Sequence, residues 1–170
     1  MKEAVIILKS LIDDENVIKH SLYAGMVYAN VCNQIGLEYN EDILSTVIVH
    51  DIGKCKSLAG EGISEKGYRY FKDSPKVFAR SIRNMHTGRY SAECNELETL
   101  VTTIIDYCDM HTTYDGKYCT IEEKVQEVGE RCGVFSKEYQ DMIENEEYYL
   151  VIDCDIKRTI KRAHELIQSK

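Results

Sequence analysis

The chain has 170 residues, of which 44% are hydrophobic and 29% are charged, and these values are typical of one soluble globular domain rather than of a disordered chain. The formal net charge of −8 and the lack of a basic patch argue against a large nucleic-acid partner, but they leave room for a small phosphate ester bound beside a metal ion. No stretch approaches the roughly 18 consecutive apolar residues of a membrane span, and no export signal is recognised, so we expect a cytoplasmic protein without a membrane partner.

Apolar residues recur at helical spacing along nearly the whole chain, which predicts an all-α, single-domain bundle of about seven or eight helices over residues 1–170. The first helix is expected over about 2–11 and the second over about 15–35. In the second helix, His20 shares its face with apolar residues and Gly36 follows as a stop signal. His20 is therefore expected to point toward the core.

A third helix is expected to begin after Asn40, which is a good N-cap, and to end at the His50-Asp51 pair. Neighbouring residues of a regular helix point about 100° apart, so both side chains can reach one ion only if the helix ends or bends there. Gly53 permits such a turn. The pair is thus predicted to end a buried helix.

The segment 54–67 contains three glycines, which predicts a mobile loop that can cover a site. Pro75, the only proline, marks the expected start of a helix running toward His86. A further helix is expected over about 96–110, where Asp109 closes an otherwise apolar stripe. Such a position is costly for a carboxylate unless it has a partner.

The last third of the chain is also expected to be helical. Thr120 and the glutamate three residues later form a capping box that opens a helix ending near Gly133. A short helix is expected after Ser136, and a long C-terminal helix with a packing role over about 146–168.

Seven cysteines are scattered singly, without a Cys-x-x-Cys pair. Their spacing favours reduced, mostly buried thiols over a disulfide framework. A structural zinc site built from these cysteines, with the histidines merely packed, is the competing interpretation.

Three polar residues, His20, His50 and Asp109, each end or interrupt the inward face of a predicted helix, and Asp51 adds a fourth. Imidazole and carboxylate groups are the ligands that suit divalent transition metals. Any one of these residues alone would be interpreted as a satisfied core or capping residue, but the four together predict a metal site.

The segment V-I-V-H-D-I-G-K, which contains His50 and Asp51, follows H-S-L-Y-A-G at His20 and precedes D-Y-C-D-M at Asp109. This pattern resembles the H…HD…D motif of the HD-domain superfamily of metal-dependent phosphohydrolases, and the resemblance spans about residues 15–131. It implies an all-helical HD-domain or PDEase-like fold and one divalent metal ion (Mn, Fe, Co, Ni, Mg or Zn). The implied ligands are His20, His50, Asp51 and Asp109.

Binuclear members of that superfamily place two more histidines between the HD pair and the last aspartate, whereas only His86 lies in that interval here. The resemblance therefore implies one metal ion. His86 can contact a phosphate, act in proton transfer or pack. We expect His111 at the surface or beside the ligands, and His164 at the surface. Asp106 competes with Asp109 as the ligand, and the match to the family motif favours Asp109.

The resemblance implies a hydrolase that acts on a phosphomonoester or phosphodiester, most plausibly a nucleotide or a nucleotide-derived molecule. Asp51 is the candidate to orient the attacking water. Lys54 is expected to steady the negative charge of the ester, with His86 as a third catalytic candidate. Arg83 and Arg89 are further candidates for substrate binding, although each fits a solvated helix face equally well.

A second functional hypothesis is a metal-containing ligand-binding or regulatory module of the same fold with little or no turnover. The expected partner in either case is a small phosphorylated molecule. A homodimer is compatible with the sequence, which does not choose an oligomeric state.

Overall fold

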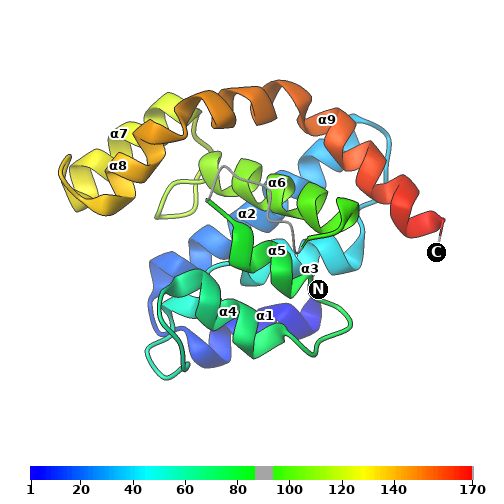
Figure 1. The fold of residues 1–170 in the computed structure, drawn as a ribbon, viewed down its shortest axis with the longest axis horizontal. Helices are drawn as coiled ribbons and strands as arrows, with labels where there is room; N and C mark the ends of the chain where they lie inside the picture. The colour runs from blue at the N-terminus through cyan, green and yellow to red at the C-terminus, as the bar shows by residue number, and fades with distance from the viewer. Residues whose placement is uncertain (87–93, 170) are drawn as a thin grey trace.

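The protein is described by a computed structural model over residues 1–86 and 94–169. These residues form an all-α fold, as the sequence predicted (Figure 1). The helices are α1 (Lys2–Leu11), α2 (Glu15–Gln34), α3 (Glu41–Val49), the short 3-10 helix η1 (Ile52–Lys54), α4 (Ile63–Phe71), α5 (Ala79–Asn84), α6 (Glu96–Met110), α7 (Ile121–Cys132), α8 (Lys137–Glu144) and α9 (Glu146–Gln168).

The described ranges contain nine α-helices, one more than the seven or eight expected. The additional helix is α4, so the prediction of a loop through Gly67 is wrong for its second half. A Cβ atom on Gly67 would lie 2.8 Å from the Ile82 side chain. This glycine thus permits close packing of α4 on α5 and does not mark a flexible segment. The helix expected from Pro75 begins later, at Ala79.

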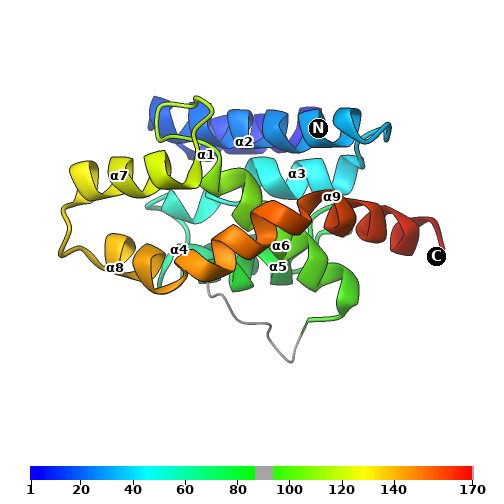
Figure 2. The ribbon, with the colours of Figure 1, turned by 90° about the horizontal axis from the view of Figure 1, so that it is seen from above.

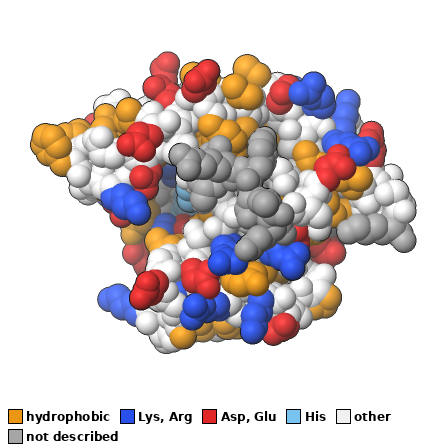
Figure 3. All heavy atoms as spheres, viewed as in Figure 1, with side chains coloured by type: hydrophobic (Ala, Val, Ile, Leu, Met, Phe, Trp, Pro, Cys, Tyr) orange, Lys and Arg blue, Asp and Glu red, His pale blue; other side chains and the backbone are white. Residues whose placement is uncertain are grey.

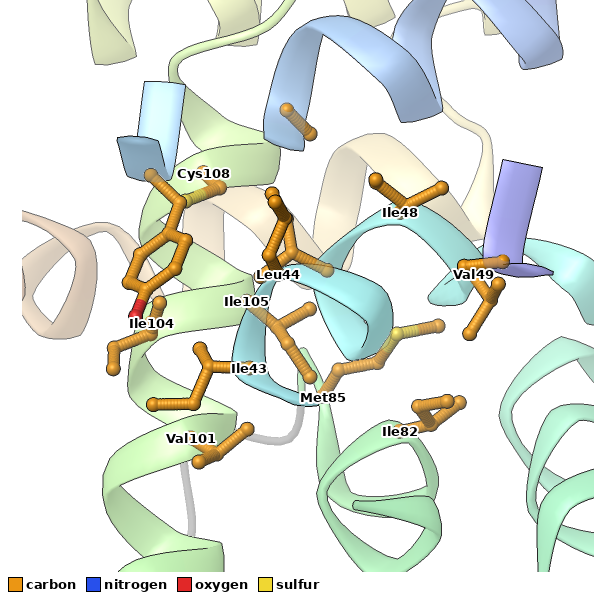
Figure 4. Packing of buried hydrophobic residues seen from close by; sticks show 14 of the residues in the cluster. Ile43, Leu44, Ile48, Val49, Ile82, Met85, Val101, Ile104, Ile105 and Cys108 are labelled. Carbon is orange, nitrogen blue, oxygen red and sulfur yellow. The ribbon is translucent and has the colours of Figure 1, made fainter. Parts of the chain in front are cut away.

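The main core surrounds α3, which packs between the α1–α2 pair and α6 (Figure 2). Figure 4 shows four side chains of α3 meeting residues of α5 and α6. The labelled residues, all buried, are Ile43, Leu44, Ile48, Val49, Ile82, Met85, Val101, Ile104, Ile105 and Cys108. Because the polar side chains of α2, α6 and the end of α3 that form the site adjoin this core, they are held rigidly.

A second, smaller apolar cluster joins the end of α6, α7, α8 and the first half of α9. It consists of Met110, Ile121, Val128, Met142, Tyr149 and Ile152. Figure 1 shows α7 and α8 side by side at one end of the molecule, with α9 running from them back across α6. We call α7 and α8 the α7–α8 arm.

His164 is buried, so the surface position expected for it is wrong. His111 is also buried, which excludes the surface position, one of the two alternatives expected for it. The ring of His164 shares a hydrogen bond of 2.9 Å with the Tyr28 hydroxyl, which also accepts the Asn40 backbone N–H. His111 lies 2.9 Å from the Cys119 carbonyl and 3.0 Å from an Asp153 carboxylate oxygen. Long-range partners satisfy the polar atoms of both rings, which is why these histidines can be buried.

All seven cysteines are free thiols, and four of them are buried, which agrees with the predicted reduced, mostly buried thiols. The group of metal-ligating side chains found in the described part of the chain contains histidine and aspartate and no cysteine. Within those residues, none of the helices combines the length and apolar character needed to cross a membrane.

Candidate metal centre

Side chains from α2, from α6 and from the junction of α3 with η1 meet near the end of α3. His20 lies in the second turn of α2, His50 follows the last residue of α3, Asp51 precedes η1, and Asp109 lies in the last turn of α6. Ligand atoms of His20, His50 and Asp109 all lie within 4.8 Å of one another. These four residues are called the His/Asp cluster below.

The distances within the His/Asp cluster suit a common ion. The Nε2 atom of His20 lies 2.8 Å from Oδ1 of Asp109 and 3.8 Å from Oδ2 of Asp51. The Nε2 atom of His50 lies 3.7 Å from the same Asp51 oxygen and 3.9 Å from the same Asp109 oxygen. Ligands bonded at about 2.1 Å to one ion stand roughly 3–4 Å apart, so these distances suit a common ion. The ligand atoms that all lie within 4.8 Å of one another belong to His20, His50 and Asp109, and Asp51 stands outside that group beside the two histidines.

The protonation of the two histidines follows from their backbone contacts. Nδ1 of His20 lies 3.1 Å from the Thr113 carbonyl oxygen, and Nδ1 of His50 lies 2.7 Å from that of Val47. A carbonyl oxygen only accepts, so each Nδ1 carries a hydrogen, and a ring with its one hydrogen on Nδ1 presents a lone pair on Nε2. This is the usual arrangement around a histidine that binds a metal.

Both Nε2 atoms are buried and neither has a partner in hydrogen-bond geometry, although Nε2 of His20 lies 2.8 Å from an Asp109 oxygen. Such atoms are rare because a buried polar group without a partner costs about 1–3 kcal/mol. Here both lone pairs face carboxylate oxygens, which are acceptors as well. A cation between them satisfies all of these groups, so the cluster fits a metal ion on its own chemistry.

Local backbone geometry brings Asp51 to the same point as His50. Helix α3 ends at Val49, and Asp51 has φ −90° and ψ 8°, outside the regular helix, before η1 begins. A Cβ atom on Gly53 would lie 1.8 Å from the carbonyl oxygen of Ile63. The glycine that the sequence associated with a turn is thus required by the close approach of the start of α4.

Burial and neighbouring charges set the protonation of the cluster. Burial lowers the pKa of His50, which keeps the ring neutral. Burial acts to raise the pKa of both carboxyl groups, but cations outweigh it. The pKa of Asp51 is lowered by Lys54, at 2.5 Å, and that of Asp109 is lowered chiefly by Lys124. Both aspartates are therefore ionised, as metal ligands must be.

His86 lies at the edge of the cluster, directly after α5. Its Nε2 atom is 3.4 Å from Oδ2 of Asp109, the carboxylate oxygen on the side away from His20. His86 has a positive φ of 61°, which is unusual for a residue other than glycine and costs about 1 kcal/mol or more. Its backbone N–H donates to Asp106 at 2.8 Å.

Asp106 is fully buried and stands outside the group of metal-ligating atoms that contains Asp109. Its second carboxylate oxygen accepts the Tyr148 hydroxyl at 2.9 Å. Burial raises the pKa of Asp106 to about 6, partly opposed by His86.

A pocket of about 520 Å³ adjoins the cluster, a volume suited to a small organic ligand. His20, Asp51 and Asp109 of the cluster line it together with His86. The space-filling view shows a hollow in which histidine atoms are visible (Figure 3). Lys54 also lines the pocket.

Arg83 and Arg89 were the arginines predicted to bind substrate. Arg83 pairs with Glu65 at 3.1 Å, stacks over Tyr68 and does not line the pocket. Arg89 falls outside the described residues.

The additional cations of the pocket come from the α7–α8 arm, and sequence reasoning did not single them out. They are Lys124, Arg131 and Lys137. The Lys124 ammonium is 2.6 Å from the Thr112 carbonyl oxygen and 3.4 Å from Oδ1 of Asp109, and the residue is only 5% exposed. One signal could have found it, because Ile121, Lys124 and Val128 share the inward face of α7.

Comparison of the chain with models of known protein families, with curated proteins and with solved structures gave no match. The resemblance to HD-domain phosphohydrolases therefore remains a prediction from the motifs. The function must be argued from the chemistry of the site.

Proposed function

We propose that this protein is a metal-dependent phosphohydrolase that cleaves a phosphomonoester or phosphodiester, namely a nucleotide or nucleotide-derived molecule. The observation that supports this most is the pair of buried Nε2 lone pairs of His20 and His50. They face the carboxylates of Asp51 and Asp109 on the floor of a pocket that also presents Lys54.

The four residues of the His/Asp cluster would hold one divalent ion. A mixed set of imidazole and carboxylate ligands suits Mn, Fe, Co, Ni or Zn and also admits Mg. When bound, such an ion supplies Lewis acidity to a phosphoryl oxygen and to an attacking water.

The chain's own side chains divide the remaining tasks. Asp51 accepts a hydrogen bond from the attacking water and so orients it toward phosphorus. Lys54, which is partly exposed in the pocket and paired with Asp51, attracts the negative charge of the ester. His86 presents its ring to the pocket from the opposite side of Asp109, where it can donate a hydrogen bond to the leaving oxygen.

The test combines metal analysis with activity. Purified protein is loaded separately with Mn, Co, Fe, Ni, Mg or Zn and assayed on a panel of nucleotides and model esters. We expect about one ion per chain and metal-dependent hydrolysis of at least one ester. Asp51→Ala should lower kcat by on the order of 100-fold or more, because it loses the water-orienting carboxylate.

The matched control is Asp13→Asn, which changes an exposed carboxylate away from the pocket and should keep full activity. Equal activity of the wild type and Asp51→Ala, or a protein that binds no metal, contradicts the proposal. A protein that binds metal and nucleotide without turning over any ester is instead a ligand-binding module.

A further inference from the structure

A fully buried carboxylate, Asp106, stands one helical turn before Asp109 on α6 and takes no part in the His/Asp cluster. One of its oxygens accepts the backbone N–H of His86 at 2.8 Å, and the other accepts the hydroxyl of Tyr148 at 2.9 Å. The carboxylate thereby connects α6 to the residue after α5 and to the first turn of α9.

Burying Asp106 costs free energy, because an ionisable side chain is removed from water into the interior of the protein. The residue that Asp106 holds, His86, has an equally unusual backbone conformation. His86 is the one described residue other than glycine with a positive φ. Conformations of this kind persist where surrounding contacts enforce them, and they concentrate at functional sites. The Asp106 carboxylate accepts the N–H of the strained residue itself.

The consequence is a defined position for the His86 ring. Residues three apart on a helix lie on the same side, so Asp106 and Asp109 approach the ring together. Nδ1 of His86 lies 3.6 Å from Oδ1 of Asp106, and Nε2 lies 3.4 Å from Oδ2 of Asp109. The ring also lines the pocket, with about a third of its surface exposed.

We infer that Asp106, held in turn by Tyr148, is a positioning residue that fixes the His86 ring at the edge of the metal centre, where the ring donates a hydrogen bond to the leaving oxygen of the phosphate ester. This inference rests on the proposed function. Asp106 itself touches neither the substrate nor the ion. It acts through the backbone of His86, and Tyr148 prevents the carboxylate from turning away.

A double-mutant cycle tests this coupling. His86→Ala, Asp106→Asn and the double variant are assayed on alkyl and p-nitrophenyl esters of the accepted phosphate. Asparagine keeps the shape of aspartate but can accept only one of the two hydrogen bonds well. A hydrogen bond to the leaving oxygen matters most for poor leaving groups, because more negative charge develops on that oxygen.

We expect His86→Ala to lower kcat by about 100-fold on alkyl esters and by less than about 10-fold on p-nitrophenyl esters. Asp106→Asn should show the same substrate pattern with a loss of about 10-fold, with KM within about twofold and an unchanged metal content. The double variant should be no slower than His86→Ala alone. Tyr148→Phe should give a smaller loss of the same pattern.

The matched control is Thr103→Val, a substitution of nearly equal volume at a buried position of α6 whose hydroxyl bonds only within the helix in the described contacts. It should keep full activity. Losses that multiply in the double variant, equal losses on both ester classes, or loss of the ion in Asp106→Asn would each overturn the inference.

Hydrogen exchange of the His86 amide separates this inference from the proposed function, because it requires no activity. In the wild type the amide is held by Asp106, and Asp106→Asn should speed its exchange by at least about 10-fold relative to amides of α3. Unchanged exchange overturns the positioning role whatever the activity. If exchange accelerates but the wild type hydrolyses no ester, the proposed phosphohydrolase function is wrong. The role of His86 toward a leaving oxygen is then wrong as well.

Discussion

The two apolar clusters of this protein build opposite sides of the same pocket. The main core, around α3 and α6, holds the His/Asp cluster at the ends of well-packed helices. The smaller cluster of the α7–α8 arm and the first half of α9 supplies the facing wall, with Val128, Met142 and Tyr149 beside the cations Arg131 and Lys137. Under the proposed function, the main core therefore carries the metal chemistry and the α7–α8 arm selects the ligand.

The regions also differ in how firmly they are held. The main core includes side chains from seven of the nine α-helices, whereas the arm packs a short apolar stripe and leaves Phe135, between α7 and α8, 95% exposed. A region with fewer buried contacts opens more readily than one with many. Polar contacts cross between the regions from Lys124 to Asp109 and from Tyr148 to Asp106, and they help to hold the wall against the candidate metal centre.

The largest expected difference between the regions concerns metal removal. An ion present at about 1,000 times its Kd stabilises the folded state by about 4 kcal/mol. Because all four proposed ligands belong to α2, α3, η1 or α6 and their junctions, chelation should speed amide exchange there more than in the arm. Comparison of exchange in metal-loaded and chelated protein checks this, and His50→Ala should abolish the difference. A uniform effect over all helices would contradict the division into two regions.

A smaller effect is expected from pH at the crossing contact of Asp106. Its folded-state pKa of about 6 lies above the ordinary value of 3.8, so between these values the folded chain retains a proton that the unfolded chain releases. This contribution to the free energy of unfolding is therefore present at about pH 4 and is lost as the pH rises through about 6. The total is about 3 kcal/mol, at about 1.4 kcal/mol per pKa unit.

Urea denaturation of chelated wild type and Asp106→Asn across this range measures the contribution. The difference in stability, wild type minus variant, should fall as the pH rises from about 4 to about 6. Ionisation of the other carboxyl groups cancels in that difference. A difference that rises or stays flat would show that the hydrogen bonds of the Asp106 carboxylate offset the free-energy cost of its burial. The pKa of Asp106 would then not be raised.

Much of the main core was predictable because its signals are local. The bounds of α1, α6 and α9 agree with the predicted helices, since apolar spacing and end signals lie within each segment. The convergence of His20, His50 and Asp109 was also predicted, because each interrupts an inward face. The N-caps Asn40 and Thr120 form the expected hydrogen bonds.

The rest depended on contacts between distant segments. The burial of His164 follows from Tyr28, which lies 136 positions away along the chain, and the position of His86 follows from Asp106 on another helix. The α7–α8 wall could not be predicted, because only the folding of the arm beside the His/Asp cluster brings Arg131 and Lys137 to the pocket. Local patterns predict which faces are buried, but not which distant polar group meets a buried atom.

The smallest expected effect tests the wall itself. Val128→Ala removes apolar surface from the pocket and from the second cluster, and should cost about 1–2 kcal/mol of stability. If the arm selects the ligand, KM for the accepted ester should rise about fivefold, while kcat and metal content stay unchanged because the His/Asp cluster is untouched.

The control Ile152→Val weakens the second apolar cluster from a residue that does not line the pocket, so its KM should stay constant. Equal KM values for both variants would mean that the wall only closes the pocket. A fall in kcat with Val128→Ala would mean that the arm also orders the metal centre.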